Sequence, residues 1–203
     1  MKHAFRLPLK RRRKNSIADL DALTHRLRDG DLIFISVINP LYQHVASATN
    51  SPATHVGIAF YDKISGWHVA ESTVPFARFT SLNRYLDRSH NNWLAVRRLP
   101  HELSDDQVHL LRRACEKRIG HMYDFGFNYD SKRLFCSKFV YEVFREAINI
   151  EIGGIQSFEK LLQPDTNQSI WFWQLWFFGA IPWSRRTVTP VSQLNASSLT
   201  AVA

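Results

Sequence analysis

The stretch FCSKFVYEVFREAI (residues 135–148) repeats its apolar side chains at the spacing of an α-helix. Side chains three and four positions apart lie on one face of a helix. The apolar face consists here of Phe139, Val140, Val143, Phe144 and Ala147. The pattern predicts a helix over 136–148 that packs this face against the rest of the domain. Cys136 is the first residue of this helix.

The position of Cys136 makes its thiol the strongest candidate for a catalytic group. The partial positive charge at a helix N-terminus favours the thiolate, and the backbone N–H groups of the first turn can bind an oxyanion. The alternative is a buried cysteine that packs as a small hydrophobic residue. The second cysteine, Cys115, lies on the apolar face of another predicted helix and is interpreted as core. Two cysteines without metal-binding spacing predict no disulfide framework and no metal site.

A thiolate nucleophile needs a base, and the base needs a group that orients it. His55 starts the predicted strand THVGIAFYD (54–62), in which Gly57 permits another group to approach closely. The turn KISG joins this strand to WHVAEST (67–73), which predicts a hairpin. In that hairpin, Glu71 would lie on the same face as His55, within one diagonal step.

Other polar residues remain candidates for the same site. Asp124, in the run Tyr123-Asp124-Phe125, is an alternative acid. Ser137, Tyr123 and Asp124 are candidates for supporting the substrate or the oxyanion.

The remaining pattern predicts an α+β domain with antiparallel strands followed by helices. Further strands are expected at LIFISVI (32–38) and WLAVRRL (93–99). Further helices are expected near 16–27, 40–49, 81–88, 104–120 and 157–162, and Ser104 and Gln107 have the form of a capping box. We expect a basic arm at 1–15, a single domain at 16–192 and a loose tail at 193–203.

The candidate residues come in the order His, Glu, Cys, whereas papain-type enzymes place the cysteine first. Several ordered segments make the chain resemble the YebB/YiiX group of permuted papain-like proteins, which is allied to the NlpC/P60 superfamily. The matching segments are GDLIF (30–34), THVGI (54–58), VAEST (69–73) with Pro75, LAVRRL (94–99), YDFGF (123–127), FCSKFVYEVF (135–144) and FFGAIPWSRRTVTP (177–190). The last of these resembles the YebB branch.

The resemblance implies a small antiparallel sheet, curved like a half-barrel, with the cysteine helix packed against it. It also implies Cys136 as nucleophile, His55 as base and Glu71 as the third polar residue. Relatives include amidases that cleave peptidoglycan, and lipid acyltransferases and phospholipases with the same thiol chemistry. The fold alone does not show which of these activities the chain has.

The charge of the chain is concentrated at its start. The formal net charge is +8, and residues 1–14 contain seven Lys and Arg residues and no acid. The rest is close to neutral, so we do not expect a nucleic-acid partner. We find neither a secretory signal nor a stretch of the roughly 18 apolar residues that a membrane span needs. This predicts a cytoplasmic protein, with a peripheral location at the inner membrane as an option.

The segment IWFWQLWFFGAIPW (170–183) contains four of the six tryptophans. It has two interpretations: core that closes the open side of the sheet, or a surface that contacts a membrane or lines the substrate site. With the basic arm, the second interpretation predicts peripheral contact with an anionic membrane.

The function expected from all of this is that of a cysteine hydrolase or amidase with a thioester acyl-enzyme. The substrate would be amide-containing, or a lipid. The alternatives are a lipid acyltransferase or phospholipase at a membrane surface, and a catalytically silent module that binds an acyl chain or peptide. No metal or organic cofactor is expected.

Overall fold

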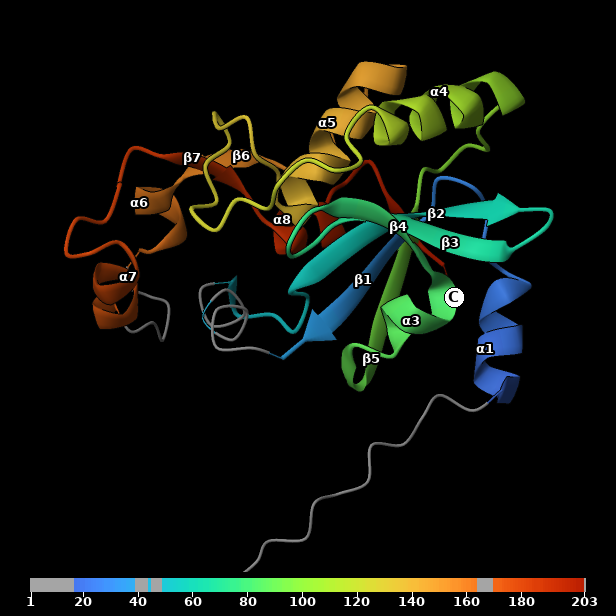
Figure 1. Cartoon of the computed structure of the whole chain (residues 1–203), viewed down its shortest axis with the longest axis horizontal. Helices are drawn as coiled ribbons and strands as arrows, with labels where there is room; N and C mark the ends of the chain where they lie inside the picture. The colour runs from blue at the N-terminus through green and yellow to red at the C-terminus, as the bar shows by residue number, and fades with distance from the viewer. Residues whose placement is uncertain (1–16, 39–43, 45–48, 164–169, 203) are drawn as a thin grey trace, which may run out of the picture.

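A computed structural model describes residues 17–38, 44, 49–163 and 170–202 (Figure 1). Its centre is a sheet of six strands in the order β4-β3-β2-β1-β5-β8, with every neighbouring pair antiparallel. The strands are β1 (Leu32–Val37), β2 (His55–Asp62), β3 (Gly66–Ser72), β4 (Ala77–Ser81), β5 (Ser89–Arg98) and β8 (Thr200–Ala201). A separate pair joins β6 (Ile155–Ser157) to β7 (Arg186–Val188).

The helices cover the sheet and extend one end of the molecule. They are α1 (Ile17–Thr24), α3 (Leu82–Leu86), α4 (Asp105–Glu116), α5 (Cys136–Ile148), α6 (Phe158–Leu161), α7 (Ile170–Trp176) and α8 (Pro190–Leu194). α4 and α5 lie side by side and α5 contacts β2 and β3, whereas α7 and α1 lie at opposite ends of the long axis (Figure 1). The predicted α+β class, with a cysteine helix against an antiparallel sheet, is confirmed.

The amphipathic pattern of α5 explains its place in the fold. Phe139, Val140, Val143 and Phe144 are completely buried. They join one apolar cluster with sheet residues that include Leu32, Phe34, Val56 and Ile58. The helix ends where Asn149 adopts a left-handed conformation, with φ of 56°. Burial of this face fixes α5, and with it Cys136, against β2 and β3.

The predicted hairpin is present, and a third strand extends it. β2 and β3 pair in the register Ile58↔Ala70, which places Glu71 diagonally from His55 on one face. β4 was not predicted, and its residues ARFTS (77–81) pair with β3 through Glu71↔Arg78. Because β4 is short and rich in polar residues, its apolar pattern is too weak to identify it from the sequence.

The end of the chain differs from the expected loose tail at 193–203. Thr200 and Ala201 pair with Arg98 and Arg97 at the edge of the sheet. Gln193 is fully buried, and its amide Nε2 donates to the carbonyl oxygens of Ser137 and Ile152, at 2.9 and 3.1 Å. Leu194, Ala196 and Leu199 also pack against the core, but they follow no helical or strand period, so the segment resembles a loop in sequence.

Some predicted features are confirmed and others lie outside the described residues. The capping box of α4 is present: Ser104 accepts from the Gln107 backbone, and the Gln107 side chain accepts from the Ser104 backbone. The basic arm at 1–15 and most of the helix expected at 40–49 lie outside the described residues. In the described part of the chain, no helix is both long and apolar enough to cross a membrane.

Gly57 allows β2, β3 and α3 to pack closely behind His55. A Cβ atom added at this position would come within 2.4 Å of Val69 Cγ1, 2.9 Å of the Ala70 carbonyl oxygen and 3.3 Å of the Tyr85 ring. We therefore expect Gly57→Ala to lower the free energy of unfolding by about 1–3 kcal/mol, as overpacking of a core does. Denaturant unfolding of the purified variant measures this change.

Gly154→Ala is the matched control, because an added Cβ at Gly154 meets no atom within 4 Å. It should leave the unfolding free energy nearly unchanged. Equal stability of the Gly57 and Gly154 variants would contradict the close packing described here.

Candidate active site

Cys136 occupies the first turn of α5. The residue before it, Phe135, is extended, with φ of −123° and ψ of 164°, and provides no side-chain cap. The first amide groups of a helix have no partner within the helix, so an uncapped start leaves N–H donors for another acceptor. The Cys136 side chain is buried, with 3% of its surface exposed. Any substrate must therefore reach the thiol through a pocket.

His55 lies at the start of β2 and is almost completely buried. Its Nε2 atom lies 2.5 Å from Glu71 Oε2. The Cys136 side chain lies close enough to the imidazole to raise the pKa of His55. Because Nε2 is bonded to Glu71, the nitrogen that remains for Cys136 is Nδ1. The structure thus brings Cys136, His55 and Glu71 together in one connected group.

The surroundings of His55 favour its protonated form. Burial alone would lower the pKa of His55, because it disfavours the charged imidazolium. The electrostatic interaction with Cys136 and the hydrogen bond to Glu71 outweigh burial, and they raise the pKa of His55 to about 9. The imidazole of His55 therefore carries a positive charge at neutral pH.

Glu71 is completely buried, and both of its carboxylate oxygens have partners. Oε1 accepts a hydrogen bond from the Thr80 hydroxyl at 2.6 Å, and Oε2 accepts one from Arg88 Nη2 at 2.6 Å. Burial opposes ionisation of Glu71, but the hydrogen bond from His55 and the positive charges of His55 and Arg88 outweigh it, lowering the pKa of Glu71 to about 2. Glu71 is therefore a carboxylate at neutral pH.

Tyr85 and Arg88, in and just after α3, hold this polar group from behind. The Tyr85 hydroxyl donates to the Ile33 carbonyl oxygen at 2.7 Å, and its ring centre lies 5.7 Å from that of His55. The Arg88 guanidinium lies 5.0 Å from the Tyr85 ring centre and also donates to Thr73. These contacts fix the positions of the His55 ring and the Glu71 carboxylate.

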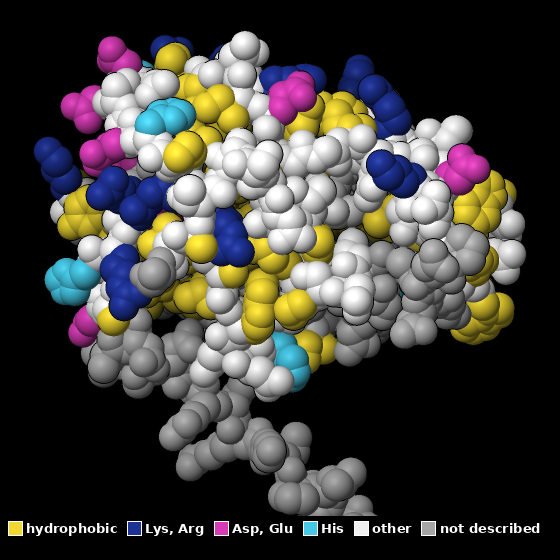
Figure 2. Space-filling view, turned by 180° about the vertical axis from the view of Figure 1, so that it is seen from behind, with side chains coloured by type: hydrophobic (Ala, Val, Ile, Leu, Met, Phe, Trp, Pro, Cys, Tyr) yellow, Lys and Arg dark blue, Asp and Glu magenta, His cyan; other side chains and the backbone are white. Residues whose placement is uncertain are grey.

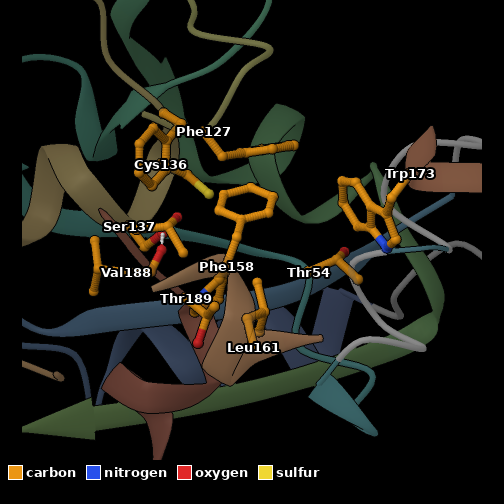
Figure 3. A pocket seen from close by; sticks show the side chains of 12 residues that line it. Thr54, Phe127, Cys136, Ser137, Phe158, Leu161, Trp173, Val188 and Thr189 are labelled. Carbon is orange, nitrogen blue, oxygen red and sulfur yellow. Dashed lines mark hydrogen bonds between the residues drawn. The ribbon is translucent and has the colours of Figure 1, made fainter. Parts of the chain in front are cut away.

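The Cys136 thiol faces an apolar pocket, where its sulfur points toward the ring of Phe158 (Figure 3). The free space between the side chains is about 30 Å³. The lining residues are Thr54, Phe127, Phe135, Cys136, Ser137, Phe158, Leu161, Trp173, Thr187, Val188, Thr189 and Pro190. The pocket joins the cysteine helix to the extension formed by α6, α7 and β7.

The three proposed supporting residues lie close to this region with different surroundings. Ser137 lines the pocket, but its hydroxyl donates to the Val188 carbonyl oxygen at 2.8 Å. Tyr123 is buried and pairs with Leu134 just before the helix, outside the pocket lining. Asp124 also lies outside the lining, and its Oδ1 accepts from the Gly126 backbone at 2.8 Å. Glu71, not Asp124, is the carboxylate bonded to His55.

Cys115 has the surroundings of a core residue. It is completely buried in α4, in the apolar cluster beneath the sheet. Burial raises the pKa of the Cys115 thiol far above its ordinary value. The interpretation of Cys115 as core agrees with this position.

Sequence reasoning did not identify Thr80 or Arg88 at the site, and it included Trp173 only as part of the segment 170–183 that could line the substrate site. Thr80 lies on the Glu71 face of β4, a strand whose sequence pattern is too weak to reveal it. Arg88 carries no signal in the sequence, because it reaches Glu71 from the turn after α3 through the tertiary fold.

A comparison with protein families gives the wider context of this site. The model of a family described as permuted papain-like amidase enzyme, YaeF/YiiX, C92 family, matches residues 26–203. The chain belongs to this family. The resemblance to the YiiX group and the expected permuted papain-like fold are therefore confirmed, and the chain is placed among papain-like amidase enzymes.

Two relatives in the permuted papain-like amidase family extend over most of the chain. The uncharacterized protein YiiX of Escherichia coli K12 is 24% identical over 189 residues, covering 92% of this chain and 91% of YiiX. A crystal structure described as the metalloprotein yiiX from Escherichia coli O157:H7 has a TM-score of 0.81 and 24% identity, covering 88% of this chain and 97% of that one. This likeness shows the common fold.

The description of that relative as a metalloprotein prompts a test of the residues in this chain. In the described ranges, no three or more His, Cys, Asp or Glu side chains are grouped in a way that could hold a metal ion. At Glu71, His55, Thr80 and Arg88 occupy the carboxylate oxygens, and the Arg88 guanidinium already supplies a positive charge. The residues around Cys136 therefore do not fit a metal.

The contrast between the two cysteines yields a test of reactivity. We expect iodoacetamide at neutral pH to modify Cys136 well ahead of Cys115, because only Cys136 lies beside a positively charged imidazole at a helix start. Peptide mass spectrometry of the native protein measures both rates. Cys115→Ser should label like the wild type, and His55→Ala should label more slowly. Equal rates at the two cysteines would argue against an activated Cys136.

The ionised state of Glu71 yields a test of stability against pH. Its folded-state pKa lies near 2, below the ordinary value of 4.5. A carboxyl group with a lowered pKa contributes stability that is complete above pH 4.5 and is lost as the pH falls toward 2. We expect the wild type to lose more stability across this window than Glu71→Gln does, as measured by thermal unfolding followed by circular dichroism.

The informative quantity is the difference in acid-induced loss of stability between the wild type and Glu71→Gln. Asp62, Asp130 and Glu146 also have lowered pKa values, through hydrogen bonds from Ser65, Arg186 and Lys117 respectively, so both proteins will weaken in acid. Parallel pH profiles for wild type and Glu71→Gln would contradict a buried carboxylate at position 71.

Proposed function

We propose that the chain is a cysteine-dependent hydrolase in which Cys136, His55 and Glu71 form and hydrolyse a thioester acyl-enzyme. The observation that carries this proposal is the connected, buried chain from Glu71 through His55 to Cys136 at an uncapped helix start. It contains the nucleophile, the base and the orienting carboxylate that thiol catalysis needs.

In the first half of the reaction, the Cys136 thiolate attacks the carbonyl carbon of an amide or ester. A C–S bond forms, and the carbonyl oxygen becomes an oxyanion. The backbone N–H groups at the start of α5 are the candidate donors to this oxyanion. Collapse of the intermediate breaks the bond to the amine or alcohol, which leaves with the proton that His55 carries. The product is an acyl group bound to Cys136 as a thioester.

In the second half, His55 is neutral and acts as the base. It takes a proton from water, whose oxygen attacks the thioester carbonyl carbon. The C–S bond then breaks, releasing the carboxylic acid and restoring the thiolate beside the protonated imidazole. If an alcohol or amine replaces water, the same step transfers the acyl group.

The partners of Glu71 explain why the base keeps one orientation. Glu71 holds Nε2 of His55 and directs Nδ1 to the cysteine, while Arg88 and Thr80 prevent the carboxylate from rotating. An ionised carboxylate stabilises the imidazolium in each state that carries it. Arg88 and Thr80 are therefore positioning residues that act through Glu71.

A water-soluble activated ester provides the direct test. With p-nitrophenyl butyrate, the wild type should release nitrophenolate and acquire a butyryl group on Cys136, detected by intact mass and peptide mapping. Cys136→Ala should do neither. His55→Ala should lower the acylation rate by about 100-fold or more, the usual contribution of a general base. Glu71→Gln should lower it less, because an orienting group contributes less than the nucleophile or base.

Cys115→Ala is the matched control and should keep the wild-type rate. Circular dichroism must show that each variant is folded. An acyl group on another residue, or full activity of folded His55→Ala, would reject the mechanism. A folded wild type that shows no acyl group would favour the silent binding module.

A further inference from the structure

The pocket beside Cys136 is lined mainly by apolar side chains, which would surround the acyl group of a bound substrate. Among the described residues, no Asp, Glu, Lys, Arg or His side chain lines it. Several of its hydroxyl groups are engaged elsewhere: Ser137 donates to Val188, Thr54 accepts from the Val37 backbone at 2.8 Å, and Thr189 accepts from the Ser192 backbone at 3.1 Å. An apolar pocket with satisfied hydroxyls favours an aliphatic or aromatic occupant over a charged one.

The helix that closes this pocket presents a second apolar face to the outside. Trp173 of α7 is 2% exposed and lines the pocket opposite Cys136 (Figure 3). Trp171 and Leu175 on the same helix are 69% and 63% exposed, and the adjoining Phe178 is 98% exposed. Trp171 and Leu175 are four positions apart and share one helix face. One side of this segment is therefore core, and the other side is exposed.

The exposed side chains continue beyond α7 at this end of the molecule. Phe125 and Trp183 are 43% and 44% exposed, and Trp176 Nε1 donates to the Phe125 carbonyl oxygen at 3.1 Å. Figure 2 shows hydrophobic side chains gathered along the edge that holds this extension, at the right of that view. We call Trp171, Leu175, Phe178, Phe125 and Trp183 the outer aromatic face. Apolar surface in such a group marks a site of contact.

The composition of the outer aromatic face favours a lipid bilayer as the occupant. Tryptophan is enriched where an apolar phase meets water. Residues 170–186 contain two arginines and no acidic residue. Arg186 pairs with Asp130, whereas Arg185 lies over the Phe177 ring, 5.0 Å from its centre, and borders the hollow lined by Phe125 and Phe178. A cation at the rim of an aromatic surface suits anionic head groups.

We infer that Cys136 acts on acyl lipids held in an anionic bilayer: the outer aromatic face contacts the bilayer, and the pocket takes the hydrocarbon acyl chain. This inference rests on the proposed function and names the substrate class of the same site. α7 connects the two surfaces, because Trp171 faces outward and Trp173 faces the thiol.

Entry of the chain requires the pocket to widen. Its free space of about 30 Å³ holds about one water molecule, so an acyl chain must displace side chains. Leu161 lies on the pocket lining and is only partly buried, which makes it the side chain best placed to move. Because Trp173 of α7 lines the pocket, a shift of α7 on contact with a bilayer would change the width of the pocket.

The first experiment measures recognition of the acyl chain without catalysis. Calorimetry on full-length Cys136→Ala compares N-methyloctanamide with N-methylacetamide, which share an amide and differ in chain length. Because each buried methylene contributes about fourfold in affinity, we expect octanamide to bind at least about tenfold more tightly. Leu161→Gln, made in the same background, should reduce this preference, and Leu110→Gln on α4 should not. Equal affinities for the two amides would overturn the inference.

The second experiment measures contact with a bilayer. Full-length protein is sedimented with phosphatidylcholine vesicles that contain or lack phosphatidylglycerol. Binding should rise with phosphatidylglycerol and fall with salt, and Leu175→Gln should weaken it by about tenfold, the effect of losing one buried leucine. Leu110 is 47% exposed on α4, so Leu110→Gln is the matched control and should bind like the wild type.

The third experiment distinguishes an acyl group taken from a soluble ester from one taken from a lipid in a vesicle. Leu175→Gln should hydrolyse soluble p-nitrophenyl butyrate at the wild-type rate, but should release fatty acid from vesicles more slowly. Absence of vesicle binding, or equal binding by the Leu175 and Leu110 variants, would overturn the inference. So would light scattering that shows a dimer lost in Leu175→Gln, since the face would then belong to a second copy. The amide and vesicle binding measurements need no catalysis, so they stand apart from a failure of the proposed function.

Discussion

The buried carboxylate of Glu71 is the interaction on which the rest of the site depends. A charge without solvent is costly unless it is paired and fully hydrogen-bonded. Here three elements provide the partners: His55 from β2, Thr80 from β4 and Arg88 from the turn after α3. One carboxylate therefore links the hairpin, the third strand and the turn after α3.

A different kind of interaction positions the nucleophile Cys136. α5 is positioned by its apolar face, which is buried against the sheet, and not by the polar group at its start. Hydrophobic packing is nondirectional, so precise placement needs a further contact. The buried Gln193 amide supplies one, because it binds the carbonyl oxygen of Ser137 next to the cysteine. The catalytic geometry thus combines a packed helix with a hydrogen-bonded hairpin.

The parts of the fold that the sequence predicts are those specified by local patterns. The period of apolar residues defines α5, and the short turn between β2 and β3 sets the register that joins His55 to Glu71. The catalytic roles of these residues and of Cys136 remain proposals. β4 and the C-terminal pairing have no strong apolar period, and Arg88 reaches Glu71 through the tertiary fold. In α7, six of the seven residues of IWFWQLW are apolar, so the pattern cannot show which side faces inward.

The separation of the site residues along the chain has a consequence for the order of folding. Glu71 is 16 residues from His55 and 17 from Arg88, so these contacts close short loops. Cys136 lies much farther along the chain and joins them only when α5 docks. Local contacts generally form before distant ones, because closing a long loop costs more chain entropy. We expect an early species in which the acid and base are assembled without the thiol. Such a species lacks the nucleophile and cannot form a thioester, so acyl chemistry begins only after α5 has docked.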